Sequence, residues 1–568
     1  MAMVIPSRVI IGLVGWAVFY IQSVQADELP FIHQKQQQQA QYLENSSAVL
    51  DSQRQQQKTL LEDAQQQRED LQKSLSILKQ TADGISTIDT RCVTINEITL
   101  QGVQSLSASA QSTLIQPYLH RCVTLAALKQ LVRAVTNTYI TYGYITSQAQ
   151  LPEQNLADGK LHIAMIEGRV ESVEIDGELP RMAKMLFPGM AGKVLNLRDV
   201  EQGLEQLNRL TSSQFTIDIQ PGIQPGYSIV HIRQQVNHFP GKVQLSIENS
   251  GQKGTGEYQA SAGLVLDAPL SLGEQWSFSW TQDTDFRPAH HSRNLVLSVS
   301  VPYGYWTARY HYFRNTARQA LMSMYNTYPY DSENQTHQVD ASRTLYRDGK
   351  QKLSLQLGSR HKVVKNAIAG EKLSVSSPVV KTTYVSSRYS TVFGGGYFTF
   401  NPTFEYGQVV TLPPVATRNS SRKFNLSSSY YYPIVSNTAY LTSFYGQLSP
   451  DNLLSPERLS LGGLYSVRGY KAQSLSGNQG LYWRQEVTHQ LNVGKVGALT
   501  LTGALDYGYL VGQSRYGVEE AHLLGSAFGV TLTRCELSSQ LMIGKPLYYP
   551  HILKPDAWAV YAAVSFEF

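Results

Sequence analysis

The feature that most constrains this fold is a series of short alternating segments that begins at Pro240 and continues to the C-terminal Phe568. Within each segment apolar residues occupy every second position and polar residues lie between them, as at Leu295, Leu297 and Val299. Successive side chains of a β-strand point to opposite faces, so this pattern predicts strands with one apolar and one polar face. The C-terminal part of the chain is therefore predicted to be all-β.

The length of this region favours a closed membrane barrel over a soluble β-sandwich, because the alternation continues without a second core pattern. An apolar outer face and a polar inner face suit a barrel with a wet lumen, and tyrosine is abundant, as it is at membrane interfaces. A transmembrane strand with its turn takes about 20 residues, so we expect about 16 antiparallel strands, with roughly 14 or 18 as alternatives.

The first 26 residues predict a secretory signal peptide. A single cation, Arg8, precedes the apolar run from Val9 to Ile21, and a small-x-small site ends at Ala26. The run is shorter than the roughly 20 residues of a spanning helix, so we expect cleavage after Ala26. A mitochondrial presequence is the alternative, but such a segment carries several arginines and no apolar core of this kind.

The cysteines agree with export. Cys92 and Cys122 belong to one small region, and an exported chain reaches a compartment in which disulfides persist, so we expect them to be bridged. Two buried thiols or a zinc site are the alternatives, and no CxxC or nearby paired histidine supports zinc. Cys535 is then left unpaired. The formal net charge of +5 is too small to argue for a nucleic-acid partner.

A glutamine-rich segment follows the signal peptide. It lacks glycine and proline from residue 31 to residue 80, and its leucines are spaced irregularly, so it predicts neither a packed core nor a coiled coil. We expect an amphipathic helix at residues 27–50 and a flexible, partly helical linker at residues 51–89. A solvated spacer is the alternative on composition alone.

Two copies of one small α/β domain are predicted at residues 90–167 and 168–237. Each copy has the order strand, short helix, helix, strand, strand. In the first copy a strand with one irregularity extends from Val93 to Leu100 and Thr124 opens the longer helix, whereas in the second copy Asn196 caps it.

A loop at residues 450–480 carries the sequence Val467-Arg468-Gly469-Tyr470. In the strand that follows the loop, the alternation places Glu486 on the inner face. In the next strand Asp506 is in phase with Thr500 and Thr502, so it also faces the lumen. One arginine and two inward acids are therefore expected in the same part of the barrel.

The loop sequence resembles the loop motif of the Omp85 superfamily of outer-membrane β-barrels, and Gly503-Ala504-Leu505-Asp506 resembles the wall motif that receives the loop arginine. The resemblance implies a loop lock, in which Arg468 pairs with Asp506 and Glu486 is able to join. Val467, Gly469 and Tyr470 complete the loop motif.

The layout as a whole resembles the TpsB transporters of two-partner secretion, which export adhesins, haemolysins and contact-dependent-inhibition toxins. The fold implied is an all-β transmembrane barrel of about 16 antiparallel strands, preceded by two small α/β POTRA-like domains and an N-terminal plug helix. The implied location is the bacterial outer membrane, with the POTRA-like domains in the periplasm.

The function implied is translocation of a large exoprotein, without nucleotide, once the plug helix moves. The exoprotein would bind the POTRA-like domains through its N-terminal secretion domain. The barrel would contact outer-membrane lipid, and the strand that ends at Phe568 resembles the signal read by the barrel-assembly machinery. An Omp85-type assembly factor is an alternative that two rather than five POTRA-like domains disfavour. A passive porin or barrel enzyme is a further alternative that the periplasmic modules disfavour.

Signals for chemistry are weak, so we expect no enzyme activity, no cofactor and no metal site. His290 and His291 lie in a polar loop without a third ligand at metal spacing. The glycines at 394–396 are predicted to form a kink within a strand rather than a phosphate cradle, since neither a lysine nor a helix follows them.

Overall fold

The structure of the protein is a computed structural model. It describes residues 47–75, 92–177, 180–234, 239–285, 287–322, 326–374, 376–410, 418–471, 473–512 and 520–568. The predicted signal peptide and residues 27–46 of the predicted plug helix lie outside the described residues. Within the described ranges, no helix combines the length and the apolar character needed to cross a membrane.

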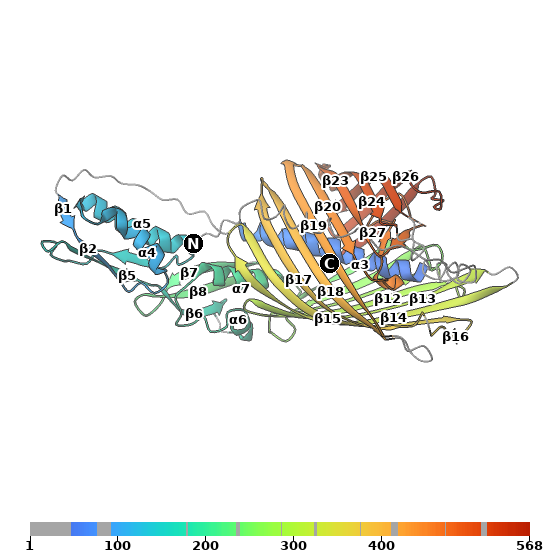
Figure 1. Ribbon diagram of the computed structural model, residues 1–568, viewed down its shortest axis with the longest axis horizontal. Coiled ribbons are helices and arrows are strands. Elements are labelled where there is room, and N and C mark those ends of the chain that lie inside the picture. Colours follow the sequence, from blue (N-terminus) through green and yellow to red (C-terminus); the bar gives the residue numbers. More distant parts are fainter. Residues whose placement is uncertain are drawn as a thin grey trace.

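Sixteen antiparallel strands close into a barrel, which confirms the predicted fold class (Figure 1). Neighbours in the ring follow chain order, and a two-residue strand, β16 (Glu371–Lys372), adds to the edge of one long strand. Closure pairs the backbone groups of each strand with both neighbours, which lipid surroundings require. The strands are β9 (Gly241–Glu248), β10 (Gln259–Asp267), β11 (Gln275–Asp283), β12 (His291–Tyr303), β13 (Trp306–Met322), β14 (Thr327–Arg347), β15 (Gln351–Ile368), β17 (Val379–Phe393), β18 (Gly396–Val410), β19 (Arg418–Val435), β20 (Thr438–Leu448), β23 (Gly480–Asn492), β24 (Ala498–Leu510), β25 (Ala521–Arg534), β26 (Leu537–Tyr548) and β27 (Ala559–Glu567).

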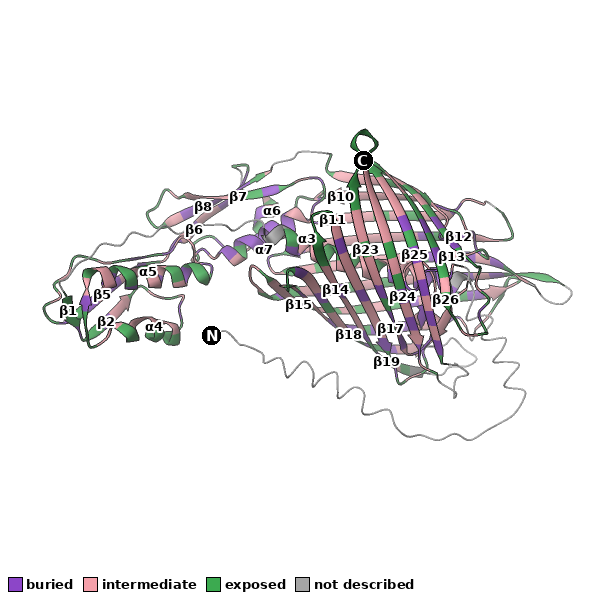
Figure 2. Ribbon diagram, turned by 90° about the horizontal axis from the view of Figure 1, so that it is seen from above, coloured by how far each residue is buried: buried purple, intermediate pink, exposed green. Residues whose placement is uncertain are grey.

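The C-terminal strand β27 closes the ring by pairing with the first strand, β9. Phe566 lies opposite Leu245, and the backbone N–H and C=O groups of Phe568 bond those of Val243 at 3.0 and 2.7 Å. Phe566 is exposed on the outer face, whereas Tyr561 is buried on the inner face, and the barrel exterior in Figure 2 is largely exposed or half-buried. Apolar side chains therefore face the position of the lipid.

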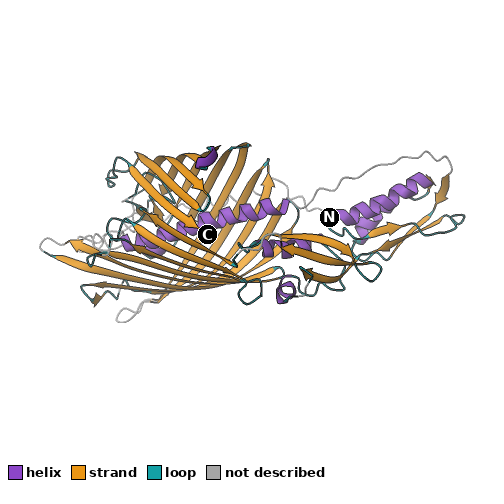
Figure 3. Ribbon diagram, turned by 180° about the vertical axis from the view of Figure 1, so that it is seen from behind, coloured by secondary structure: helices purple, strands orange, loops and turns teal. Residues whose placement is uncertain are grey.

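The two small domains lie at one end of the barrel, and the chain enters β9 from that end (Figure 1, Figure 3). Short turns join the strands there. One of them contains Gly394 and Gly395, both with positive φ, between β17 and β18. The expected kink within a strand is therefore wrong, and the two glycines form a hairpin turn, which needs the left-handed conformation.

In the first small domain, β2 (Glu97–Gln101), β5 (Lys160–Ile166) and β4 (Gln148–Gln150) form one sheet. The helix α5 (Leu125–Thr141) begins after Thr124, whose hydroxyl accepts a hydrogen bond from the N–H of Ala127. Its apolar face is buried in the domain core by Leu128, Leu131, Val135 and Tyr139. The remaining helical elements are α4 (Ala108–Ile115) and the short 3-10 helix η1 (Gln116–Tyr118).

The strand predicted with one irregularity from Val93 to Leu100 is two strands in different sheets, so the prediction of a single strand is wrong. β1 (Cys92–Ile95) pairs with β3 (Arg121–Thr124) in a separate two-stranded sheet, whereas β2 belongs to the larger sheet. The chain breaks at Asn96 because the N–H groups of Asn96 and Glu97 both donate to the Gly159 carbonyl, at 2.7 and 3.2 Å.

The second small domain has the predicted element order. Its sheet has the strand order β6 (Arg169–Ile175), β8 (Tyr227–Gln234) and β7 (Phe215–Pro221). The helix α7 (Leu197–Asn208) begins at Asn196, whose side chain accepts a hydrogen bond from the N–H of Arg198. α7 and α6 (Arg181–Leu186) pack on the sheet through one apolar cluster.

One helix, α3 (Ser47–Leu75), lies along the barrel lumen (Figure 1, Figure 3). Its contacts include β13, β17, β18 and β19 of the wall. We expected a linker from residue 51, so the prediction is wrong for residues 51–75. This stretch is rich in glutamine and leucine, which are strong helix formers, and the lumen supplies the contacts that fix the helix.

Candidate functional site

A long loop between β20 and β23 folds back into the barrel. It contains a 3-10 turn, η2 (Ser455–Glu457), and two short strands, β21 (Leu459–Leu461) and β22 (Leu475–Gly477), which pair with each other. The predicted motif lies between these strands. The loop therefore carries its arginine on a small hairpin-like base inside the barrel.

Arg468 and Asp506 form a bidentate ion pair. Nε and Nη2 of Arg468 donate to Oδ2 and Oδ1 of Asp506 at 2.6 and 2.5 Å, and the backbone N–H of Arg468 donates to Oδ2 at 2.9 Å. Both residues are 0% exposed. Three charge-assisted hydrogen bonds thus fix both the position and the orientation of the loop tip.

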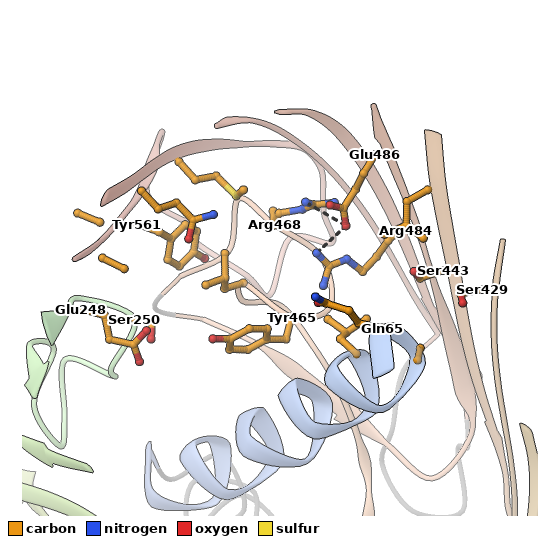
Figure 4. A pocket seen from close by; sticks show the side chains of 18 of the residues that line it. Gln65, Glu248, Ser250, Ser429, Ser443, Tyr465, Arg468, Arg484, Glu486 and Tyr561 are labelled. Carbon is orange, nitrogen blue, oxygen red and sulfur yellow. Dashed lines mark hydrogen bonds and ion pairs between the residues drawn. The ribbon is translucent and has the colours of Figure 1, made fainter. Parts of the chain in front are cut away.

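Glu486 joins this pair from β23. Its Oε1 lies 3.4 Å from Nη1 of Arg468 and 3.0 Å from Nη2 of Arg484, and Figure 4 shows both guanidinium groups directed at it. Arg484 also lies directly opposite Asp506 in the strand ladder. Two cations and two anions therefore neutralise one another. Removing one partner of a buried pair typically costs about 3–5 kcal/mol.

The other residues of the loop motif pack against the wall. Val467 is buried in an apolar cluster with Leu461 and Leu523. The Tyr470 hydroxyl lies 2.8 and 2.7 Å from two wall carbonyl oxygens, those of Leu524 and Tyr548, and its single proton bonds one of them at a time. The loop tip is therefore held by apolar as well as polar contacts.

Close approach of the loop to the wall depends on glycines that the sequence analysis did not single out. A Cβ atom added at Gly525 would lie 1.8 Å from the Arg468 carbonyl oxygen, and one at Gly544 would lie 2.7 Å from the backbone nitrogen of Gly469. A Cβ at Gly508 would lie 2.8 Å from Val467 Cγ2. These glycines belong to the adjacent strands β24, β25 and β26. We call Gly508, Gly525 and Gly544 the glycine patch, because they leave the wall under the loop without side chains. In the sequence, the only indication of this close approach is the presence of isolated glycines within predicted strands.

A second ion cluster fixes the base of the loop and was also missed. Glu457 in η2 accepts hydrogen bonds from Lys423 at 2.9 Å and from Lys362 at 3.1 Å. Glu405 lies 3.4 Å from Lys423 and 3.5 Å from Arg360. The partners belong to β15, β18 and β19, so no local pattern in the sequence brings them together.

Helix α3 is bonded directly to the loop. Gln53 Nε2 donates to the carbonyl oxygens of Ser455 at 2.7 Å and Arg458 at 3.2 Å, and Gln57 Nε2 donates to that of Ser460 at 2.7 Å. Further along the helix, a cavity of about 370 Å³ separates α3 from the lock, and Gln65, Arg468, Arg484 and Glu486 line it (Figure 4). The helix and the loop lock are thus neighbours in one assembly within the lumen.

The second small domain docks on the barrel through buried charges. Glu205 on α7 pairs with Lys352 and lies 2.6 Å from Arg347 Nη1. Burial alone would raise the pKa of the Glu205 carboxyl, but Lys352 and Arg347 outweigh burial and lower this pKa to about 2. Arg209 also donates to the Gly273 carbonyl oxygen at 2.9 Å. The ionised carboxylate therefore helps to hold the domain at the barrel mouth.

Cys92 and Cys122 are joined by a disulfide that links β1 to β3, with their Cα atoms 5.3 Å apart. Cys535 is exposed and free, in the turn between β25 and β26.

His290 pairs with Asp285 at 3.0 Å. Within the described part of the chain, no group of three or more candidate ligands could hold a metal ion.

Comparison with known families decides what this architecture is. Residues 226–532 match the family described as haemolysin secretion/activation protein ShlB/FhaC/HecB. The chain belongs to this family. Residues 93–168 match its ShlB-type POTRA domain, and residues 169–221 match a further POTRA domain.

Individual members of the family are similar along most of their length. The outer membrane transporter CdiB of Dickeya dadantii is 36% identical, over 90% of this chain and 93% of that protein. The hemolysin transporter protein ShlB of Serratia marcescens is 31% identical, over 73% of this chain and 75% of that protein. The solved structure of CdiB from Escherichia coli superposes with a TM-score of 0.85 at 35% identity, covering 92% of this chain and 99% of that one. These matches confirm the predicted resemblance to outer-membrane transporters of two-partner secretion.

Proposed function

We propose that this chain carries a large exoprotein across the bacterial outer membrane without nucleotide. The observation that carries the proposal is the content of the lumen, which is a helix and a folded loop rather than a packed core of wall side chains. The buried side chains in the described part of α3 are the polar Asp51, Ser52, Gln53 and Gln57 and the apolar Val49, Leu50 and Leu71. Such a helix can leave at a limited hydrophobic cost, because few apolar side chains are buried and water replaces the hydrogen bonds that it loses.

The exported chain would enter through the POTRA domains in the periplasm. In the second domain β7 pairs with β8 on one side and has no other described strand beside it. An extended segment from the N-terminal secretion domain of the partner can add to such an edge through backbone hydrogen bonds. Pairing of this kind reads the backbone rather than a particular sequence, which suits an unfolded polypeptide.

The barrel would give the chain its passage, and the loop lock would hold the shape of that passage. Arg468, Asp506 and Glu486 keep the loop against one wall, so the rest of the lumen becomes free when α3 moves. Folding of the exoprotein outside would drive transport. The apolar outer face would contact outer-membrane lipid, and the barrel-assembly machinery would read the strand that ends at Phe568 during insertion.

Deletion of the gene tests this function. We expect one large polypeptide to disappear from the cell surface and the culture medium, and to return when the intact chain is supplied again. A POTRA-deleted barrel that inserts normally serves as the control for membrane integrity. An unchanged set of surface and secreted polypeptides contradicts the proposal.

A further inference from the structure

A second cavity, of about 510 Å³, lies between α3, α7 and the barrel wall. It is unusually rich in charge. Five cationic side chains line it: Arg209, Arg309, Arg347, Lys352 and Arg388. We call these residues the basic wall. Four of them belong to the consecutive wall strands β13, β14, β15 and β17, so they form one continuous surface.

Helix α3 supplies most of the opposing charge. The carboxylates that line the cavity are Glu62, Asp63 and Asp70 of α3, with Glu205 of α7 and Asp348 of a turn. With the helix in place, five cations face five carboxylates. Without it, Glu205 and Asp348 remain in the lining, Asp340 remains bonded to Arg309, and Glu201 remains 3.8 Å from Arg347. Loss of the three α3 carboxylates therefore shifts this surface towards positive charge. Because the cavity lies between α3, α7 and the barrel wall, this change in charge is screened less than one on the outer surface would be.

The contacts of the basic wall leave it able to bind further carboxylates. Arg388 Nη2 lies 3.9 Å from Asp63 Oδ1, and Nε and Nη2 of Arg388 both lie 2.9 Å from the side-chain amide oxygen of Gln67 on α3, so these donors become available when the helix leaves. Nε of Arg309 donates to Asp340 at 2.8 Å, but Nη2 of Arg309 is buried without a hydrogen-bond partner among the described residues. The same is true of Nε of Arg209. A buried N–H donor without a partner is unfavourable, and an incoming acceptor would remove this cost.

We propose that the basic wall binds an acidic, extended stretch of the exported polypeptide, and that α3 occupies this surface as an internal competitor. This inference rests on the proposed transport function. A chain segment that carries more carboxylates than the helix replaces the helix contacts one by one. Export and displacement of the plug then become the same event, driven by charge at the periplasmic end of the lumen.

Binding of model peptides to the full chain tests this proposal. The probe is a fluorescent peptide of alternating glutamate and serine, and the matched control peptide has lysine in place of glutamate. We expect the acidic peptide to bind the helix variant Asp63→Asn/Asp70→Asn about tenfold more tightly than the unchanged chain, since the competitor is weakened. High salt should weaken this binding, and the basic peptide should bind neither protein well.

Variants of the basic wall test whether these cations bind the acidic peptide. Arg309→Gln/Arg388→Gln in the helix variant should abolish the gain in acidic-peptide binding, whereas Arg309→Lys/Arg388→Lys should keep most of it. The control Lys495→Gln/Arg534→Gln removes the same charge from two exposed positions outside the cavity and should change nothing. Heat-modifiable gel mobility identifies the folded protein in each case. Equal binding of both peptides, or binding unaffected by the glutamine variants, overturns the proposal. Because no exoprotein is present, this failure is distinct from failure of export.

Discussion

Gln57 of helix α3 donates a buried hydrogen bond of 2.7 Å to the carbonyl oxygen of Ser460, which lies in the folded loop. Gln53 makes two similar bonds one turn earlier. The helix therefore contacts the same loop that carries Arg468, and its departure must break these bonds. A polar side chain that bonds a backbone carbonyl gives a reversible attachment, since water can replace either partner.

The first prediction concerns this attachment. In Gln53→Ala/Gln57→Ala three hydrogen bonds are lost, each worth about 1 kcal/mol, so the ratio of time without the plug to time with it should rise by roughly 150-fold. Single-channel recording in planar bilayers measures this as longer and more frequent large openings. Gln65→Ala is the control, because the described bond of Gln65 is to Glu69 on the same helix. Unchanged openings would show that these bonds do not hold the plug.

The second prediction concerns the glycine patch. In Gly525→Ala the new methyl group would collide with the Arg468 carbonyl oxygen, so the loop cannot occupy its place, and export should fall by about tenfold or more. Gly503→Ala is the matched control on the adjacent strand, since a Cβ there has nothing within 4 Å. Export is measured per folded transporter. Equal export from the two variants would mean that the loop does not need this close approach.

The third prediction concerns the disulfide. Cys92 and Cys122 are separated by 30 residues in the sequence, so loop closure on the chain-entropy model stabilises the first domain by about 3–4 kcal/mol. Thiol labelling of the denatured, unreduced protein should modify Cys535 alone. In the purified transporter, Cys92→Ser/Cys122→Ser should lower the temperature at which the first domain unfolds. The temperature at which the barrel unfolds should not change. Three reactive thiols in the unreduced chain would exclude the bridge.

The fourth prediction is a pH dependence of domain docking. The pKa of Glu205 is lowered to about 2, below the ordinary value of 4.5, so its stabilising contribution is present above pH 4.5 and is lost as the pH falls towards 2. A difference of this size corresponds to about 3 kcal/mol. Hydrogen exchange in α7 should therefore be faster in Glu205→Gln at neutral pH. The two proteins should converge as the pH approaches 2, and parallel curves across this range would contradict the assignment.

The sequence was sufficient for the barrel because lipid and lumen impose a period of two on every strand, and β27 shows this down to Phe568. It was not sufficient for α3. The contact between Gln57 and Ser460 joins residues 403 positions apart. The irregular leucines alone favour a linker, because the contacts that fix the helix come from distant parts of the chain. The turn at Gly394 and Gly395 depends only on local sequence and could have been predicted. The prediction of a kink within a strand is wrong, because these glycines form a hairpin turn.

The lock could be anticipated in part. Inward phase placed Glu486 and Asp506 correctly, and the structure brings Arg468 to both. The glycine patch and the Glu457 cluster could not be anticipated, because each depends on how a loop meets strands that are distant in sequence. A glycine such as Gly525 shows its role only when the atom that approaches it is known.

The role of the lock in export is the central claim. Arg468→Ala or Asp506→Ala frees the loop and leaves one charge buried without its partner, at a cost of about 3–5 kcal/mol. The exchange Arg468→Asp/Asp506→Arg should restore part of the activity. It should not restore all of it, because the new arginine would lie opposite Arg484 in the ladder.

The most direct measurement is the amount of exoprotein secreted per unit of folded transporter, with folding judged by heat-modifiable gel mobility. We predict that each single variant inserts a folded barrel but loses most export, and that the exchange recovers a measurable part of it. Normal export from both single variants, at the transporter level of the unchanged chain, would show that Arg468 and Asp506 do not act as a lock.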